Sequence, residues 1–156
     1  MGPPGFGFSI IWEWLRRALA GNRQEVQMSY NLMVKREIGY LHVQVQGIRT
    51  AEVLKTMTAE VLKLCLDGRY SRVLLDIRAM TGNLDPIDSY EFGSSYLPSL
   101  DAAGQIRAAV IDLAENRNRF EMVMHNARIK GFDIRIVSSA DEAKRWLGVG
   151  KGLAGG

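Results

Sequence analysis

The sequence is poor in residues that form disulfides or bind metals. It has one cysteine, Cys65, among 156 residues, which excludes an intramolecular disulfide and is typical of a reducing compartment such as the cytoplasm. Cys65 lies on the apolar stripe of a predicted helix, where we expect a buried, inert thiol. The two histidines, His42 and His125, lie in different predicted elements without acidic or cysteine neighbours at metal-ligand spacing. We therefore expect a cytoplasmic protein with no metal and no other cofactor.

Long apolar runs and concentrated charge of one sign are also absent. The apolar stretch near the N-terminus is too short to span a bilayer, and Arg16 and Arg17 follow it, which is the reverse of a signal peptide. The formal net charge is +3, but the lysines and arginines are scattered, whereas binding to a phosphate backbone requires a basic stripe. These features argue against nucleic acid as the partner.

The composition that is present suits one soluble domain. Hydrophobic residues make up 47% of the chain and charged residues 24%, both close to the averages of globular proteins, and the length suits a single core. We expect three segments, namely an N-terminal extension over residues 1–28, a folded domain over 29–147, and a flexible glycine-rich tail over 148–156.

The N-terminal extension contains a predicted amphipathic helix over residues 9–20. Its Trp12 and Trp14 favour docking of this helix onto the domain or onto a second subunit, which would give a homodimer. Two alternatives stay open. One is an interfacial membrane anchor with Arg16 and Arg17 at the head groups, which we favour less because the segment is short and has few cations. The other is a disordered extension.

Alternating apolar residues predict two strands at the start of the domain. Apolar side chains occupy every second position over 30–34 and again over 41–45, with a turn at Gly39 between them. This pattern indicates an antiparallel hairpin with one buried face. Thr50 then begins a helix that ends at Gly68.

Three further strands alternate with helices over the rest of the domain. Nearly continuous apolar sequence predicts strands at 72–77 and 106–112, and alternation predicts another at 132–137. Asp85 before Pro86 predicts the start of the first helix, and capping-box pairs predict the starts of the other two. The pairs are Asn118 with Glu121 and Ser139 with Glu142.

The predicted helices should bury apolar side chains against the sheet. On the first, we expect Ile87, Tyr90 and Leu97 to point inward and the helix to stop before Pro98. On the last, we expect Trp146 to be buried. The resulting order is β-β-α-β-α-β-α-β-α, which implies right-handed crossovers with parallel pairing and an antiparallel edge. The predicted fold class is α/β, with a mixed, mostly parallel five-stranded sheet and helices packed on it.

Two local motifs accompany this order. The first is Leu-Leu-Asp-Ile over 74–77, a strand that leads into a loop and a capped helix; the second is the ending with Gly131, the strand at 132–137, Asp141-Glu142-Ala143 and Trp146-Leu147. Over residues 30–147 the chain resembles the STAS domains of bacterial anti-sigma-factor antagonists, in particular the SpoIIAA-like branch. The resemblance implies a non-catalytic regulatory domain that binds another protein.

The resemblance also concerns a phosphorylation site. In such antagonists the strand ending in Asp leads to a serine that a partner kinase phosphorylates. Counting from Asp76, this position falls near Asp85 and Pro86, neither of which accepts a phosphate as a serine does. We therefore expect a domain without the usual phosphoacceptor, and Ser89 and Thr81 are the nearby hydroxyls that remain as candidates.

The loop after the strand at 72–77 lies where open α/β sheets place ligands and partners. The next loop, after the strand at 106–112, reaches the same edge, and an arginine beside a helix start can hold a phosphate or carboxylate. The alternative is structural, with a turn at Gly82 and Asn83, a solvated Arg117 and a helix cap at Asp85. We favour the cap for Asp85 alone. The candidate partner-surface residues are Thr81, Gly82, Asn83, Asp85, Ser89, Asn116 and Arg117.

Asp76 and Asp112 end adjacent predicted strands, and paired carboxylates are used in general acid–base catalysis. The sequence shows no nucleophile, base or glycine-rich phosphate loop to accompany them. Structural roles are favoured, in which each carboxylate accepts hydrogen bonds from loop amides. We therefore expect no catalytic residues and no enzymatic activity.

Two functions remain, and the sequence does not name a partner for either. The first is a regulatory domain that presents residues 78–89 to another protein. The alternative is a binder of a lipid or another small apolar ligand, because methionine side chains adapt to irregular apolar surfaces. The candidate lining residues are Met33, Met57, Met80, Met122 and Met124.

Overall fold

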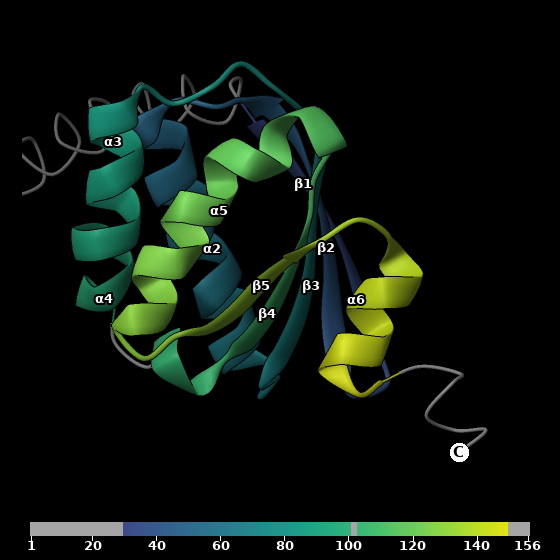
Figure 1. The fold of residues 1–156 in the computed structure, drawn as a ribbon. Coiled ribbons are helices and arrows are strands. Elements are labelled where there is room, and N and C mark those ends of the chain that lie inside the picture. The colour runs from purple at the N-terminus through teal and green to yellow at the C-terminus, as the bar shows by residue number, and fades with distance from the viewer. Residues whose placement is uncertain (1–29, 101–102, 150–156) are drawn as a thin grey trace, which may run out of the picture.

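A five-stranded mixed sheet lies at the centre of the fold, with its strands in chain order, β1-β2-β3-β4-β5 (Figure 1). The computed structural model describes residues 30–100 and 103–149. The predicted helix at 9–20 with Trp12 and Trp14, and the tail beyond Val149, lie outside the described residues.

The first two strands form the predicted antiparallel hairpin. β1 (Tyr30–Glu37) pairs with β2 (Tyr40–Ile48), and Val34 lies opposite Val43. Gly39 in the turn has φ of 87°, a conformation that disfavours any residue with a Cβ atom. Glycine at this position therefore lets the turn stay short, and the hairpin prediction is confirmed.

The other three strands continue the sheet in parallel. β3 (Arg72–Thr81) pairs with β2 on one side and with β4 (Arg107–Ile111) on the other, and β5 (Asp133–Val137) forms the far edge. Parallel neighbours need a crossover connection, and a helical segment connects each consecutive pair from β2 to β5. The predicted mostly parallel sheet with one antiparallel edge is confirmed.

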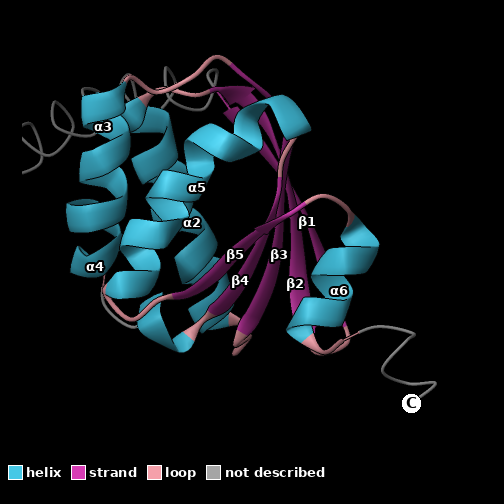
Figure 2. Cartoon of the chain, viewed as in Figure 1, coloured by secondary structure: helices cyan, strands magenta, loops and turns pink. Residues whose placement is uncertain are grey.

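Helices cover both faces of the sheet (Figures 1 and 2). α2 (Ala51–Asp67) and α5 (Ala114–Ile129) lie with residues 86–99 on one face, over the larger core, and α6 (Ala140–Leu147) lies on the other. The predicted order β-β-α-β-α-β-α-β-α is confirmed. Within residues 30–100 and 103–149, no helix is long and apolar enough to cross a membrane.

Side chains cap three helices at the predicted positions. Thr50, Asp85 and Ser139 each accept a hydrogen bond from the backbone N–H three residues later, at 3.1, 2.8 and 3.1 Å. Such a cap stabilises a helix by about 1 kcal/mol. The capping box of α6 is modified, because Glu142 accepts hydrogen bonds from the backbone N–H and hydroxyl of Ser138 instead of Ser139.

The start of α5 differs from the prediction. The helix begins at Ala114, so the capping box of Asn118 and Glu121 is wrong, and both side chains are exposed inside the helix. The reason lies in Asp112, whose carboxylate accepts the backbone N–H that follows it at 2.8 Å. This carboxylate accepts a hydrogen bond from an amide that would otherwise be unpaired. Its negative charge also interacts favourably with the positive end of the helix dipole. The helix therefore begins shortly after β4.

The helical segment after Asp85 also extends further than predicted. α3 (Pro86–Glu91) continues through a π-helical turn (Phe92–Tyr96) into the short helix α4 (Leu97–Ser99). Pro98 therefore lies inside the last turn instead of after it. Proline has no N–H to bond a carbonyl one turn earlier, and the wider π-turn before it accommodates this loss.

Two side chains of α3 point outward, contrary to the prediction. Ile87 and Tyr90 are 73% and 62% exposed, whereas Phe92 and Leu97 are buried. The segment meets the core through its π-turn and α4, because these are the parts that contribute buried side chains. Ile87 and Tyr90 therefore belong to the surface of the protein and not to its core.

Trp146 is half-buried at the edge of α6, so the prediction of a buried indole is wrong. The guanidinium carbon of Arg107 lies 4.1 Å from the centre of its ring, and that of Arg135 lies 5.9 Å away. These cation–π contacts hold the ring at the surface. Val149 is 5% exposed and packs in the core under α6, so the packed structure continues past Leu147.

Candidate functional site

The carboxyl ends of β2, β3 and β4 lie at one edge of the sheet, because these strands are parallel. Arg49 follows β2, the loop 82–85 follows β3, and Asp112 follows β4. The helices α2, α3 and α5 begin at the same edge (Figure 1). In open α/β sheets this is where ligands and partners bind, so we describe this edge as the candidate site.

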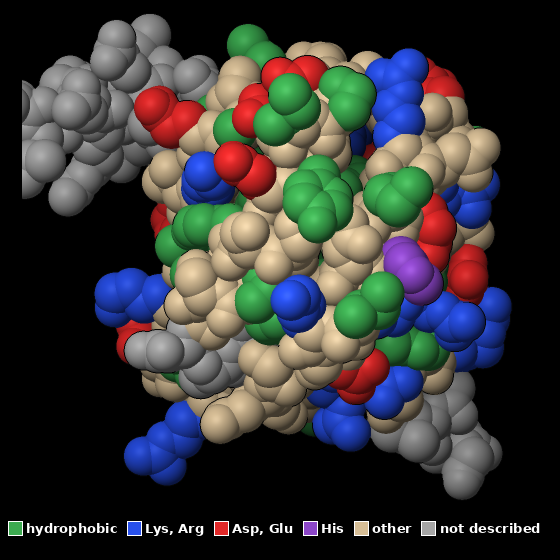
Figure 3. Space-filling model, turned by 60° about the vertical axis from the view of Figure 1, so that its left-hand side comes forward, with side chains coloured by type: hydrophobic (Ala, Val, Ile, Leu, Met, Phe, Trp, Pro, Cys, Tyr) green, Lys and Arg blue, Asp and Glu red, His purple; other side chains and the backbone are tan. Residues whose placement is uncertain are grey.

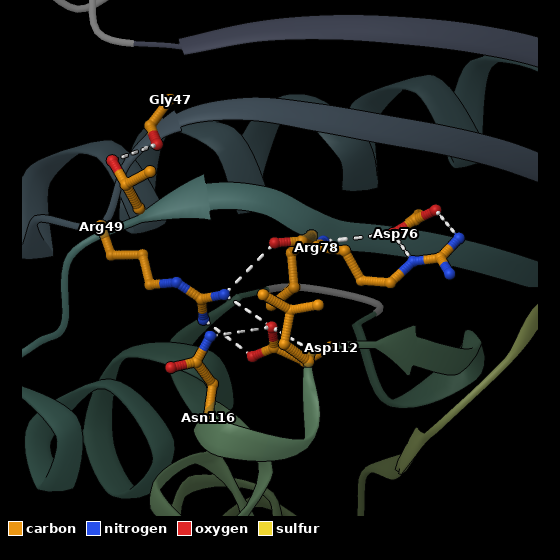
Figure 4. Close-up of polar contacts among 9 residues, drawn as sticks. Gly47, Arg49, Asp76, Arg78, Asp112 and Asn116 are labelled. Carbon is orange, nitrogen blue, oxygen red and sulfur yellow. Dashed lines mark hydrogen bonds and ion pairs between the residues drawn. The ribbon is translucent and has the colours of Figure 1, made fainter.

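A buried ion pair joins two of these strand ends (Figure 4). Arg49 donates from Nη1 to Oδ2 of Asp112 at 2.9 Å and from Nη2 to Oδ1 at 2.6 Å. The two side chains are 3% and 0% exposed, and Nη2 also donates to the backbone oxygen of Ile77 at 3.2 Å. An ion pair that is buried away from water is stable only when its geometry is close to ideal, and the two parallel hydrogen bonds of a bidentate pair provide such geometry. The pair therefore fastens the end of β2 to the end of β4.

Asp112 also orders the first turn of α5. Its Oδ1 accepts the backbone N–H of Leu113 at 2.8 Å and the side-chain amide of Asn116 at 3.4 Å. The predicted structural role of Asp112, accepting hydrogen bonds from loop amides, is confirmed. Its main partner, Arg49, was not predicted.

A small pocket opens beside the ion pair. Its volume is about 20 Å³, which is enough for one water-sized group. The Phe120 ring forms part of its wall, with its centre 5.5 Å from the guanidinium carbon of Arg49. Its polar lining residues are Arg49, Asn83, Ser89, Asn116 and Arg119.

Three of the predicted surface residues, Asn83, Ser89 and Asn116, therefore meet at this pocket. They come from the loop after β3, from α3 and from α5, and the parallel strand order is what brings them together. Whether a partner touches them stays a prediction.

The other four predicted residues do not line the pocket. Asp85 caps α3, as favoured from the sequence, and Gly82 has φ of 82°, where glycine is the favoured residue. The hydroxyl of Thr81 lies 3.5 Å from the backbone oxygen of Gly47, at the limit of a hydrogen bond. Arg117 lies in the first turn of α5.

Sequence reasoning missed two arginines of the site, Arg49 and Arg119. The signal for Arg49 was its position, directly after a strand and directly before the helix cap Thr50. The signal for Arg119 was its spacing, because it lies three residues after Asn116 and so on the same helix face. It was hidden by the assumption that α5 begins at Asn118.

Asp76 is not part of this site, so the two carboxylates do not form a pair. Leu74, two residues before Asp76 in β3, packs under α6, and alternation places Asp76 on that same face. Arg78 donates to it from Nε and Nη2 at 2.9 and 2.7 Å. Burial alone would raise the pKa of Asp76, but the hydrogen bonds and charge of Arg78 hold the pKa below its ordinary value. Asp76 therefore has a structural role, but its partner is Arg78 in the same strand and not the loop amides that the sequence led us to expect.

The thiol and the imidazoles lie apart from the site. Cys65 is fully buried, and burial raises the pKa of its thiol to about 11, so it is protonated and inert at neutral pH, as predicted. His125 is exposed on α5 and His42 is half-buried on β2. Among the described residues, no group of three or more His, Cys, Asp or Glu side chains could hold a metal ion.

A second hollow lies in the larger core. It is an apolar cavity of about 100 Å³ between the sheet and the helices. Met57 and Met124 line it, whereas Met80 is buried elsewhere. Met33 and Met122 are 58% and 63% exposed and do not line this cavity. Met33 instead lines a separate hollow on the other face of the sheet, with Gln44 and Asp76.

Comparison with known proteins finds similarity in structure only. No model of a known protein family matches the sequence, and no curated protein matches it. An anti-sigma factor antagonist from Mycobacterium paratuberculosis matches with a TM-score of 0.52 at 13% identity, over 76% of this chain and 94% of that chain. An uncharacterized protein with a SpoIIAA-like fold from Shewanella loihica matches with a TM-score of 0.49 at 22% identity, over 76% and 93%.

The match to the antagonist shows the fold. The chain has a STAS/SpoIIAA-like α/β fold, with helices on both faces of a mixed five-stranded sheet. The fold expected from the sequence is thereby confirmed. A fold hosts many functions, so the function has to be argued from the surface.

Proposed function

We propose that the protein is a non-catalytic, cytoplasmic regulatory domain that binds another protein through residues 78–89 and the rest of α3. The fold is that of an anti-sigma factor antagonist. The observation that carries the proposal is the pair of exposed apolar side chains on α3, next to the pocket at the edge of the sheet.

Ile87 and Tyr90 lie three residues apart and so on one face of α3. Their side chains are 73% and 62% exposed. Their apolar surface therefore contacts water and is not packed in the core of this protein. Figure 3 turns the side of α3 and α4 toward the viewer, and apolar side chains lie across the middle of that face. Aromatic and large apolar side chains of this kind supply most of the energy at protein interfaces.

The same surface lacks the serine on which anti-sigma-factor antagonists are switched. Asp85 stands near that position, and its carboxylate is engaged in the cap of α3. We propose that partner binding here is not controlled at that position. Ser89, half-buried at the pocket, and Thr81, exposed at the end of β3, remain candidates for phosphorylation. Phosphopeptide mapping after incubation with a cognate kinase tests both, and modification of neither removes the switch.

The partner surface is tested by quantitative capture of partners from cells of the source organism. Ile87→Ser with Tyr90→Ser removes the exposed apolar pair, and we expect recovery of the specific partner to fall at least about tenfold, equivalent to about 1.4 kcal/mol. The matched control is Ile38→Ser, since Ile38 is 96% exposed at the hairpin turn. Equal recovery by wild type and by the Ile87/Tyr90 variant would exclude this surface.

The second candidate function is binding of a small apolar ligand in the cavity of the larger core. Its lining includes Leu97, Ala108 and Phe132 and is almost wholly apolar. A dry cavity of about 150 Å³ with such a lining binds benzene in another protein, so about 100 Å³ suits a smaller molecule or the end of an acyl chain.

This alternative is tested by native mass spectrometry of freshly purified protein and by NMR of the protein under increasing xenon pressure, because apolar cavities also bind xenon. If a ligand binds, Ala108→Leu should abolish binding, because the larger side chain fills the space. Absence of a co-purified molecule together with no saturable shift with xenon would rule the alternative out.

A further inference from the structure

The pocket beside Arg49 has an unusual polar wall. One side chain, Arg49, is buried, and its Nε is shielded from solvent yet has no hydrogen-bond partner in the described part of the chain. Buried donors are nearly always satisfied, because leaving one unpaired destabilises a protein by about 1–3 kcal/mol. The Nε of Arg49 is therefore available to an acceptor from outside the described residues, as are three buried nitrogen atoms away from this pocket, those of Arg107, Arg117 and Asn126.

The remaining polar lining also favours an acceptor. Asn83 carries an amide with two N–H donors, the amide of Asn116 keeps one donor besides the one directed at Asp112, and Ser89 carries a hydroxyl. The charge of Arg49 is balanced by Asp112, whereas Arg119 is exposed and forms no ion pair with another described residue. No carboxylate lines the pocket, so its net charge is positive.

The size of the pocket limits what can enter. A volume of about 20 Å³ admits one oxygen atom and not a whole side chain or ring. A group that fits is an oxyanion that inserts one oxygen between Arg49 and the two asparagines while its remaining oxygens reach Arg119 at the surface. Carboxylate and phosphate both have this shape, and arginine binds both.

We propose that this pocket is an oxyanion site, in which Arg119 supplies the charge and Asn83, Ser89, Asn116 and the Nε of Arg49 supply hydrogen bonds. The site goes beyond the proposed partner surface, because it binds a free anion whether or not a protein covers it. Where the anion belongs to a partner, the pocket accepts an acidic side chain or a phosphoryl group.

The test is an NMR titration of the isotope-labelled full chain with sodium phosphate and, separately, with sodium acetate, at matched ionic strength and pH. We expect saturable shifts confined to the signals of Asn83, Ser89 and Asn116. Saturation with phosphate alone identifies a phosphoryl site, with acetate alone a carboxylate site, and with both a general oxyanion site.

Matched variants separate the pocket from general attraction of anions. Arg119→Gln should weaken binding about tenfold or more, as expected for loss of one charge-assisted hydrogen bond. Arg72→Gln removes the same charge from an exposed position at the other end of β3 and should leave binding unchanged. Equal weakening by both variants, or no saturable shift with either anion, would overturn the proposal. The second result is the one expected if water alone fills the pocket.

The two proposals on this edge fail separately. The Ile87→Ser/Tyr90→Ser variant changes neither the lining nor the charge of the pocket, so it should keep its anion binding. Loss of partner capture by this variant, with anion binding intact, supports both proposals. If the variant loses partner capture as expected, but neither the wild type nor the variant binds an anion, only the oxyanion site is removed.

Discussion

At the scale of single residues, Arg49 connects the parts of the candidate site. It directly follows β2, pairs with Asp112 directly after β4 and donates to Ile77 in the strand between them. Two charges of this kind are stable inside a protein only together, because each alone would be buried without a partner. The pair therefore links the ends of β2 and β4 to the middle of β3.

The contribution of this pair can be measured by a double-mutant cycle in urea. Arg49→Met or Asp112→Leu alone should lower the unfolding free energy by about 3–5 kcal/mol, because the remaining charge is buried and unpaired. The double variant should lose less than the sum of the two. Lys63→Met is the control, since it breaks a pair with both partners exposed, and it should change stability far less. Additive losses in the cycle would contradict the coupling.

His42 should make stability depend on pH. Burial, followed by the nearby charge of Lys35, lowers the pKa of His42 below its ordinary value of 6.5. The folded protein therefore holds this imidazole neutral while the unfolded chain takes up a proton. The stabilisation is complete above pH 6.5 and is lost as pH falls through the lower pKa of the folded state.

The measurement for His42 is the urea midpoint between pH 8 and pH 5. The wild type should lose stability over this range, and His42→Gln should lose distinctly less. His125→Gln changes an exposed imidazole and should behave like the wild type. If His42→Gln and wild type respond identically to pH, the acid sensitivity comes from other groups.

At the scale of elements, the π-turn between α3 and α4 is held by a close approach of two backbones. A Cβ atom at Gly93 would lie 2.6 Å from the backbone oxygen of Val123 in α5, which is closer than real contacts allow. Only glycine lets the segment lie this near to α5.

Gly93→Ala should therefore destabilise the protein, by about 1–3 kcal/mol. The sign of the change in stability is informative, because replacing glycine by alanine inside an ordinary helix stabilises the helix by about 1 kcal/mol. Ser95→Ala, at an exposed position of the same turn, is the control and should leave the thermal midpoint nearly unchanged. Stabilisation of the Gly93→Ala variant would mean that the two segments separate freely.

The helices and strands also show which parts of this structure could be predicted from the sequence. Strands, parallel order and three caps followed from local patterns, because apolar period and capping chemistry act within a few residues. The start of α5 depended on the carboxylate of Asp112, and the continuation of the helical segment through Pro98 depended on the π-turn before it. The partner of Asp112 is Arg49, 63 positions away. Such contacts arise from tertiary packing, which a pattern along the chain does not contain.

At the scale of the whole molecule, the domain has two hydrophobic cores, which lie on opposite faces of one sheet. The smaller core, under α6, contains Leu74, Ile111 and Leu147, and Val149 completes it. The backbone N–H of Val149 also donates to the carbonyl of Lys144 at 3.0 Å. These contacts hold Val149 against α6, two residues beyond the predicted boundary at residue 147.

The boundary can be tested with two shortened chains. Residues 29–149 should fold with the thermal midpoint of the full chain, whereas residues 29–147 should be less stable by about 1.5–3 kcal/mol, the value of one buried valine. The difference in stability between the two shortened chains gives the contribution of the last two residues, since the rest of the sequence is identical.

If the chain 29–149 does not fold, the segment 1–28 contributes to stability. That outcome would favour docking of Trp12 and Trp14 onto the domain, and light scattering of the full chain would then separate docking within one chain from a homodimer.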